Sequence, residues 1–211
     1  MLARRWLEFQ AVKMTSTAKS WQTDPISAKK KELRKKIAAR LAEVSTEEVR
    51  RQSEAVAEKV LSSSWFKNAR RLSVYVHTKG EIETDRIVEE SLKLGKQLFI
   101  PQFAKGNPQM RLLRVPSHSD FLKLEPTLWG IRQPSDSDQW EDYEGTVPYL
   151  GALDLILMPG VAFTLNGCRL GHGMGYYDRA LNAHRRQFGV LPARYGLALM
   201  QQIVNEVPKQ K

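Results

Sequence analysis

The 211-residue sequence contains a single cysteine, Cys168, and no long apolar run. One cysteine excludes an internal disulfide and a zinc site built from cysteines, and it favours a reducing compartment such as the cytoplasm. No stretch approaches the roughly 18 to 20 consecutive apolar residues of a membrane span, so we expect no membrane partner. The histidines are too scattered to predict a metal cluster: His77, His118, His172 and His184.

Positive charge, in contrast, is abundant, with a formal net charge of +10. Residues 1–71 carry 17 Lys/Arg against 8 Asp/Glu, whereas the remaining residues carry 16 against 15. A nucleic-acid surface is one interpretation of this basic third. Because the basic residues alternate with Glu on helical patterns, solvated helix faces that attract a small polyanionic substrate are favoured instead.

Residues 1–26 show no clear periodicity, and we predict a flexible N-terminal tail followed by a single domain over residues 27–211. Basic residues lie between apolar ones in this tail, as in a weak mitochondrial presequence: Arg4, Arg5, Trp6, Leu7, Phe9, Lys13 and Lys19. Glu8 and the short apolar part argue against that interpretation. The cytoplasm is therefore the expected compartment, and mitochondrial import through the tail is the alternative.

Helical spacing predicts one helix that begins after Ser27 and a second that begins at Ser45 or Thr46. A strand over 72–76, a helix over 84–94 and a strand over 97–100, stopped by Pro101, then form a βαβ unit.

The next predicted segments are a strand over 110–115, a long irregular connection over 116–149, a strand over 153–158, a helix to about 186 and a strand over 195–199. Strands that alternate with helices predict an α/β fold, a Rossmann-like three-layer sandwich with a mostly parallel central sheet. Ligands of such folds gather at the carboxyl ends of the strands.

The segment RLGHGMGYYD, residues 169–178 and here called the glycine loop, is the most informative motif. Glycines at alternate positions let the backbone adopt positive φ and approach a ligand, while Arg169 and His172 add cationic or donor groups. The loop lies between a predicted strand and a helix N-terminus, where an anion is already favoured. A glycine-rich turn without a ligand is the alternative, but the flanking Arg169 and Tyr176-Tyr177-Asp178 favour a phosphate site.

Other motifs, in order along the chain, resemble those of the 5-formyltetrahydrofolate cyclo-ligases. KKELR at 30–34 is similar to that family's K-x-x-L-R, and EIET at 81–84 to its E-I-x-T. WGIRQP at 129–134 is similar to W-x-I-x-x-P, and MPGVAF at 158–163 precedes the glycine loop. The resemblance covers about residues 28–208.

The resemblance implies an enzyme that closes the ring of 5-formyltetrahydrofolate to give 5,10-methenyltetrahydrofolate in one-carbon metabolism. ATP would be the cosubstrate, Mg²⁺ the cofactor, and ADP and phosphate the other products. The partners implied are these small molecules alone, with no nucleic acid, and the protein would be a monomer.

The resemblance also implies roles for individual residues. The ATP-binding set would be Lys30, Lys31, Glu32, Leu33, Arg34, Arg169, Leu170, Gly171, His172, Gly173, Met174, Gly175, Tyr176 and Tyr177. The folate-binding set would be Val76, Glu81, Trp129, His172, Gly173, Met174, Gly175 and Tyr176. Asp178 would help to bind Mg²⁺, and the catalytic residues would be Arg169, His172 and Tyr176.

Without the resemblance, several of these residues have simpler interpretations. Lys30 and Arg34 fit a solvated basic helix face, and Asp178 fits an acid that interacts favourably with a helix dipole. Val76 fits an ordinary core position, and Trp129 fits an anchor that ties a long loop to the core. Of Tyr176 and Tyr177, one would face the ligand and the other the core.

Two features depart from the family pattern. His172 stands where an arginine is common and Met174 where a lysine is common, and loss of a fixed cation there costs about 2–4 kcal/mol if nothing replaces it. The sequence also ends at Lys211, where family members typically continue into a segment with another acid thought to assist the metal. We therefore keep an alternative: an impaired or truncated form, or a non-enzymatic relative that binds folate or RNA.

Overall fold

The computed structural model describes residues 11–13, 25–135, 137–143 and 151–209. Its centre is a six-stranded sheet in the order β1-β8-β5-β2-β3-β4. The inner strands β8 (Ala193–Leu197), β5 (Leu155–Met158), β2 (Arg71–Ser73) and β3 (Gln97–Phe103) are parallel to one another. The edge strands β1 (Ala11–Lys13) and β4 (Met110–Arg114) are antiparallel to theirs.

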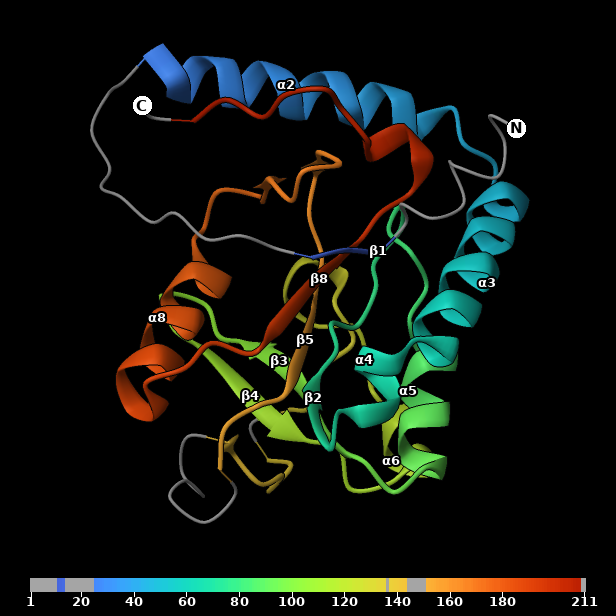
Figure 1. Ribbon diagram of the computed structural model, residues 1–211, viewed down its shortest axis with the longest axis vertical. Helices are drawn as coiled ribbons and strands as arrows, with labels where there is room; N and C mark the ends of the chain where they lie inside the picture. Colours follow the sequence, from blue (N-terminus) through green and yellow to red (C-terminus); the bar gives the residue numbers. More distant parts are fainter. Residues whose placement is uncertain (1–10, 14–24, 136, 144–150, 210–211) are drawn as a thin grey trace.

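Helices cover both faces of the sheet, so the predicted three-layer α/β sandwich is confirmed (Figure 1). One face packs against α3 (Thr46–Ser62), α4 (Ser64–Asn68), α5 (Asp85–Lys93) and α6 (His118–Leu122). The other face packs against α8 (Tyr176–Phe188).

Neighbouring strand residues belong to different cores because successive side chains point to opposite faces of a sheet. Leu155 and Leu157 lie in the core beneath α3 to α6, whereas Ile156 and Met158 lie in the core beneath α8.

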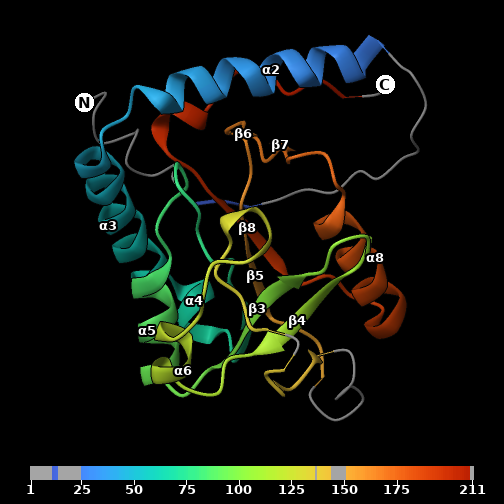
Figure 2. The same ribbon diagram turned by 180° about the vertical axis from the view of Figure 1, so that it is seen from behind.

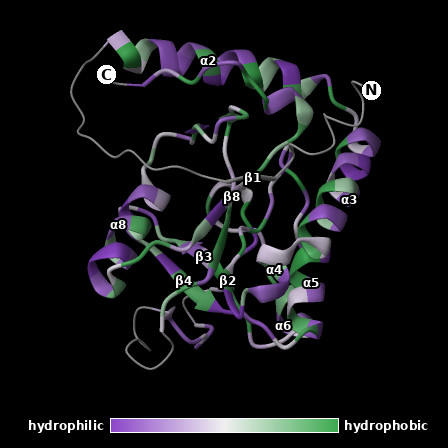
Figure 3. Cartoon of the chain, in the orientation of Figure 1, coloured by the Kyte–Doolittle hydropathy of each residue, from purple (hydrophilic) through white to green (hydrophobic). Residues whose placement is uncertain are grey.

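Helix α2 (Pro25–Ala42) lies across the end of the sheet at which the parallel strands finish (Figures 1 and 2). It is largely hydrophilic, and Ile37 is its one fully buried residue (Figure 3). Ile37 packs on a small two-stranded ladder of β6 (Ala162–Phe163) and β7 (Arg169–Leu170). Short 3₁₀ turns, η1 (Leu128–Gly130) and η2 (Met200–Gln202), complete the described elements. No helix in the described ranges is long and apolar enough to cross a membrane.

The predicted βαβ unit is confirmed by β2, α5 and β3, and α3 begins after Ser45, whose side chain accepts a hydrogen bond from the Glu48 amide. Helix α2 begins two residues before Ser27, because Pro25 suits a first helical position, where its missing N–H is not needed. The strand predicted over 72–76 ends at Ser73. The connection predicted to be irregular contains α6 and η1.

The prediction that Pro101 stops a strand is wrong, since β3 continues to Phe103 and Pro101 lies opposite Leu112 of β4. The carbonyl of Phe99 accepts a hydrogen bond from the Val74 amide, just beyond the end of β2. Pro101 lies two residues after Phe99, so its backbone nitrogen also faces the side of β2. No strand residue of β2 remains there to accept an N–H, and proline is therefore tolerated.

Three residues of the predicted tail form β1, which pairs with β8 through Ala11↔Leu197 to Lys13↔Tyr195. No periodicity of the residues predicted this strand. The rest of the predicted tail, up to residue 24, lies outside the described residues.

Candidate active site around the glycine loop

The glycine loop lies at the carboxyl-terminal edge of the sheet and runs from β7 into the first turn of α8. Gly175 is the N-cap of α8, with the left-handed φ of 68° that glycine tolerates best. No side chain caps this helix end among the described residues. The first-turn N–H groups of α8 are thus available to an anion, which the local sequence predicts.

Arg169 is held beneath the loop with only 14 % of its side chain exposed. Its Nη1 donates a hydrogen bond to the Pro159 carbonyl at 3.1 Å, and its guanidinium lies 5.5 Å from the centre of the Tyr177 ring. Burial lowers the pKa of Arg169, and the nearby Asp178 carboxylate opposes that shift. Arginine stays charged in proteins, so a fixed cation lies under the loop.

Arg34 brings a second cation to the same loop from α2. Its Nε donates a hydrogen bond to the Gly171 carbonyl at 2.9 Å. A Cβ at Gly173 would lie 3.4 Å from Arg34 Nη2, and the φ of Gly173 is +108°. The helix and the loop therefore meet closely, and a position with this φ strongly favours glycine.

The predicted α2 motif divides between two faces of the helix. Lys30, Leu33 and Arg34 are partly buried, and Leu33 packs against the cluster that contains Ile37. Lys31 and Glu32 are exposed. The interpretation of Arg34 as a solvated residue is wrong, because its guanidinium is hydrogen-bonded to the loop.

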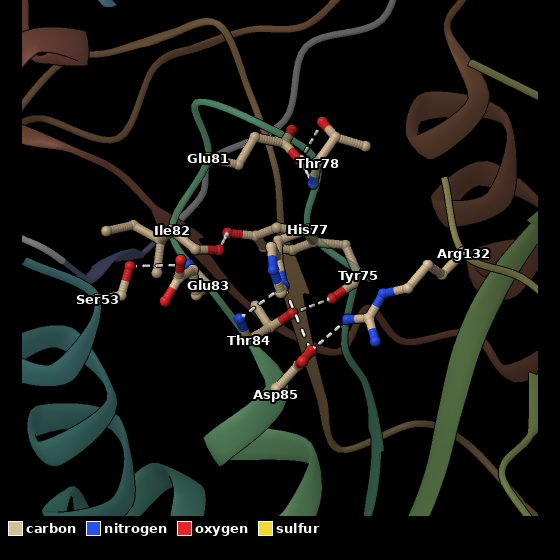
Figure 4. A network of polar contacts seen from close by, with 10 residues as sticks. All are labelled: Ser53, Tyr75, His77, Thr78, Glu81, Ile82, Glu83, Thr84, Asp85 and Arg132. Atoms are coloured by element: carbon tan, nitrogen blue, oxygen red, sulfur yellow. Dashed lines mark hydrogen bonds and ion pairs between the residues drawn. The ribbon is translucent and has the colours of Figure 1, made fainter. Parts of the chain in front are cut away.

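Glu81 comes to the loop from the segment that follows β2. One of its oxygens accepts hydrogen bonds from the Thr78 amide (2.8 Å) and hydroxyl (3.0 Å), as Figure 4 shows. The other oxygen lies 3.9 Å from His172 Nε2. Glu81 is 15 % exposed and His172 is 70 % exposed. Val76, in the same segment, is buried in the core beneath α3 to α6.

Both tyrosines at the start of α8 are buried, so the predicted division between ligand and core is not seen in their burial. The Tyr176 ring packs at 4.9 Å from Phe103, and its hydroxyl donates a hydrogen bond to the Asn107 carbonyl at 3.1 Å. The Tyr177 hydroxyl has no partner among the described residues. Burial raises the pKa of Tyr177, so this hydroxyl is a neutral donor close to Arg169.

Trp129 is 56 % exposed, so its ring is only partly buried. Its ring lies 6.1 Å from Phe103 and 6.2 Å from Tyr176, and Trp129 is the exposed member of this group of three rings. Its backbone is left-handed, with φ of 59°, which is rare for a bulky residue.

Asp178 lies in the first turn of α8, 57 % exposed and 3.8 Å from Arg169 Nη2. The described residues contain no group of three or more His, Cys, Asp or Glu that could hold a metal ion. A single exposed carboxylate still fits Mg²⁺, because this ion is usually bound by one or two carboxylates together with phosphate oxygens and water.

Arg179 belongs to the same surroundings, although the sequence did not indicate it. Its guanidinium donates hydrogen bonds to the carbonyls of Met174 (2.7 Å) and Pro108 (2.6 Å) and lies 5.2 Å from the Tyr176 ring centre. A cation thus lies beside Met174, where the family commonly has a lysine. Pro108 is 71 positions away in the sequence, so no local pattern could have found this contact.

Comparison with known proteins gives a consistent result. Residues 26–211 match the model of the 5-formyltetrahydrofolate cyclo-ligase family. A probable 5-formyltetrahydrofolate cyclo-ligase of Caenorhabditis elegans is 49% identical over 85% of this chain and 85% of its own. The 5-formyltetrahydrofolate cyclo-ligase of Mus musculus is 34% identical over 87% and 88%.

Among solved structures, the NMR structure of Aquifex aeolicus 5,10-methenyltetrahydrofolate synthetase superposes with a TM-score of 0.66 and 32% identity. The match covers 86% of this chain and 84% of that one. A relative from Arabidopsis thaliana, 31% identical over 82% of this chain and 65% of its own, is named a mitochondrial 5-formyltetrahydrofolate cyclo-ligase.

Proposed function

The chain belongs to the 5-formyltetrahydrofolate cyclo-ligase family of ligases, and from this premise we propose that it closes the ring of 5-formyltetrahydrofolate at the expense of ATP. The formyl oxygen attacks the γ-phosphorus of ATP, and ADP leaves. N10 then attacks the formyl carbon and loses its proton, and phosphate departs with the formyl oxygen. The products are 5,10-methenyltetrahydrofolate, ADP and phosphate.

The observation that carries the proposal is the convergence of separate elements on the glycine loop. Arg34 from α2 and Arg169 from β7 flank its backbone, and the uncapped end of α8 closes it. Glu81, from the segment after β2, lies at its side. Positive charge and a carboxylate are thus close together, as the binding of a triphosphate beside a heterocycle with N–H groups requires.

The phosphates of ATP would lie along the first turn of α8, where backbone N–H groups point outward. Arg169 and Arg34 would bind phosphate oxygens through their planar forks. Because Arg169 is largely buried, its charge acts where water screens it little. Met174 supplies no cation, and Arg179 beside it would replace part of the missing charge.

Asp178 would contribute one oxygen to Mg²⁺, whose charge would balance that of the phosphates when it is bound. The exposed carboxylate at the helix start is open to such an ion, and its distance of 3.8 Å from Arg169 leaves it free of a tight ion pair.

Glu81 would accept hydrogen bonds from N–H groups of the pterin ring. Its free oxygen faces His172, so the loop residue and the folate would compete for or share this carboxylate. The exposed ring of Trp129, backed by Phe103 and Tyr176, offers an apolar face to a flat heterocycle. Catalysis would rest mainly on positioning and charge neutralisation.

The direct test mixes the full chain with 5-formyltetrahydrofolate, ATP and Mg²⁺ and follows the absorbance of the methenyl product. Turnover that depends on ATP supports the proposal. A folded protein that binds folate without turnover would instead support the non-enzymatic alternative.

Arg169→Ala should raise the KM for ATP sharply, by about tenfold or more, because a buried cation at the phosphates is lost. Arg186→Ala is the matched control, since Arg186 is exposed in the last turn of α8. Unchanged kinetics in Arg169→Ala would exclude Arg169 from the phosphate site.

We further propose a monomer that acts in the cytoplasm on small molecules, without a nucleic-acid partner. The pattern that resembles a presequence falls mostly in residues 1–10 and 14–24, outside the described residues. A fusion of residues 1–26 to a fluorescent protein tests the alternative, because import would place the label in mitochondria.

A further inference from the structure

Asp85, the first residue of α5, has two basic neighbours that come from different segments (Figure 4). Arg132 Nη2 lies 2.6 Å from its Oδ1, and His77 Nδ1 lies 3.3 Å from the same oxygen. His77 belongs to the segment that carries Glu81, and Arg132 follows Trp129 by three residues. One carboxylate therefore connects the two segments on which folate binding is proposed to depend.

Trp129 lies at the tip of a small hairpin. The Thr127 amide donates a hydrogen bond to the Ile131 carbonyl at 2.9 Å, and the Gly130 amide donates one to the Thr127 carbonyl at 3.1 Å. Trp129 is left-handed and more than half exposed. Its own packing is thus a weak source of order, and such a conformation persists only where the surroundings hold it.

Two anchors hold the base of this hairpin. Gln133 exchanges hydrogen bonds with the backbone of Phe103, at 2.8 and 2.9 Å, and so ties the hairpin to β3. Arg132 ties it to α5 through Asp85, and its side chain is only 25 % exposed. The guanidinium also lies 5.3 Å from the centre of the Phe121 ring of α6. The first anchor holds the hairpin to β3, and the second holds it to Asp85.

We propose that Asp85 and Arg132 form a clasp that positions Trp129 against the folate ring, and that the clasp sets the affinity of the enzyme for 5-formyltetrahydrofolate. This inference rests on the proposed function. Asp85 and Arg132 act through Trp129 and are positioning residues, whereas Trp129 contacts the substrate. His77 extends the clasp to the segment of Glu81.

The protonation state of Asp85 suits this role. Burial raises the pKa of Asp85, but the hydrogen bonds and charges of His77 and Arg132 outweigh it and lower the net pKa. The carboxylate is therefore ionised at neutral pH. The same ring nitrogen of His77, Nδ1, lies 3.2 Å from the Thr84 amide, and when it accepts from that amide it cannot donate to Asp85. Arg132 is then the permanent cationic partner of Asp85.

The kinetic test compares wild type with Arg132→Gln and Asp85→Asn. Each variant should raise the KM for 5-formyltetrahydrofolate by about tenfold and leave kcat and the KM for ATP within about twofold, since a ground-state contact is lost. Arg132→Lys should recover part of the affinity, because it keeps the charge. Arg114→Gln is the matched control: Arg114 forms a 2.9 Å ion pair with Glu141, away from Asp85, and its loss should leave both KM values unchanged.

The same substitution of Arg132, made in a Trp129→Ala variant, shows whether Arg132 acts through Trp129. Trp129→Ala alone should raise the KM for 5-formyltetrahydrofolate, and adding Arg132→Gln should raise it by less than about twofold further. An equal, multiplicative effect of Arg132→Gln in both backgrounds would overturn the clasp, as would an unchanged KM in Arg132→Gln when the wild type turns over.

Hydrogen exchange gives a readout that does not need activity. In Arg132→Gln the amides of Gly130 and Ile131 should exchange faster, while those of β3 keep their protection. Unchanged exchange at the hairpin would overturn the clasp. A wild type without turnover, combined with faster exchange in the variant, would contradict the proposed function and leave the clasp supported.

Discussion

Substitution of Gly171 by alanine would test how closely Arg169 and the loop backbone are matched. A Cβ at this position would lie 2.8 Å from Arg169 Nη1, whereas ordinary contacts begin at 3.4 Å. The guanidinium must therefore withdraw by about 0.6 Å to relieve the clash. The Pro159 carbonyl and the neighbouring Tyr177 ring oppose this movement, because they hold the guanidinium in place. The hydrogen bond of 3.1 Å would then stretch or bend beyond useful geometry.

The size of the effect follows from that displacement. A shift of somewhat less than 1 Å at a positioning cation should reduce kcat/KM for ATP by about ten- to a hundredfold. Stability should change little, because the φ of Gly171 lies outside the positive region and alanine there lowers the entropy of the unfolded chain. Steady-state kinetics over a range of ATP concentrations, together with thermal unfolding, measure the two effects.

Gly173→Ala provides the contrast. Gly173 has φ of +108°, so alanine there should cost about 1–2 kcal/mol of stability through backbone strain alone. Wild-type kinetics in a folded Gly171→Ala protein would refute the reasoning. An undiminished effect of Gly171→Ala in an Arg169→Ala background would refute it equally, since no guanidinium would remain to be displaced.

Three further outcomes are expected. Arg179→Ala should lower kcat/KM by about three- to tenfold, because the loop loses its tie to the Pro108 carbonyl and a cation beside Met174; a full wild-type rate in the same assay would contradict this. Lys96→Met should lower the free energy of unfolding by about 1–2 kcal/mol in a denaturant titration, since its ammonium donates to three carbonyls at the end of α4, and activity per folded molecule should persist. Because the pKa of Asp85 is lower in the folded protein, its stabilising contribution is present above about pH 3.9 and is lost as the pH falls through the folded value. Asp85→Asn should therefore flatten the acid limb of an unfolding curve followed by circular dichroism, and an unchanged limb would show that Asp85 contributes nothing.

Local patterns predicted much of the fold because they act within a few residues. The Ser45 cap, the glycine after α5 and the apolar runs of β3 and β5 are local features, and each marks its element in the structure. The same holds for the start of α8, where Gly175 allows the left-handed cap. Pro101 misled the prediction, because a proline is tolerated or not according to which strand lies beside it.

Of the candidate site, only the residues that belong to sequence motifs could be predicted. The glycines together with the flanking Arg169 and Tyr176-Tyr177-Asp178 favoured an anion site over a bare turn, and the resemblance to the family added Arg34, Glu81 and Trp129. Burial could not be predicted: Trp129 is exposed and the hydroxyl of Tyr177 is buried without a partner among the described residues. The contacts of Arg179 and Asp85 join residues 71 and 47 positions apart, and no periodicity marks them.

The sequence by itself determined the succession of the main helices and strands from α2 to β8, the position of the glycine loop and the family. These properties follow from side-chain periodicity, from the φ preferences of glycine and proline, and from motifs read in order along the chain. Only the tertiary structure decided that α2 lies against the loop, that β1 extends the sheet and that Asp85 connects the Glu81 and Trp129 segments. Such contacts depend on how distant segments pack, because their energies arise only when the chain has closed around them.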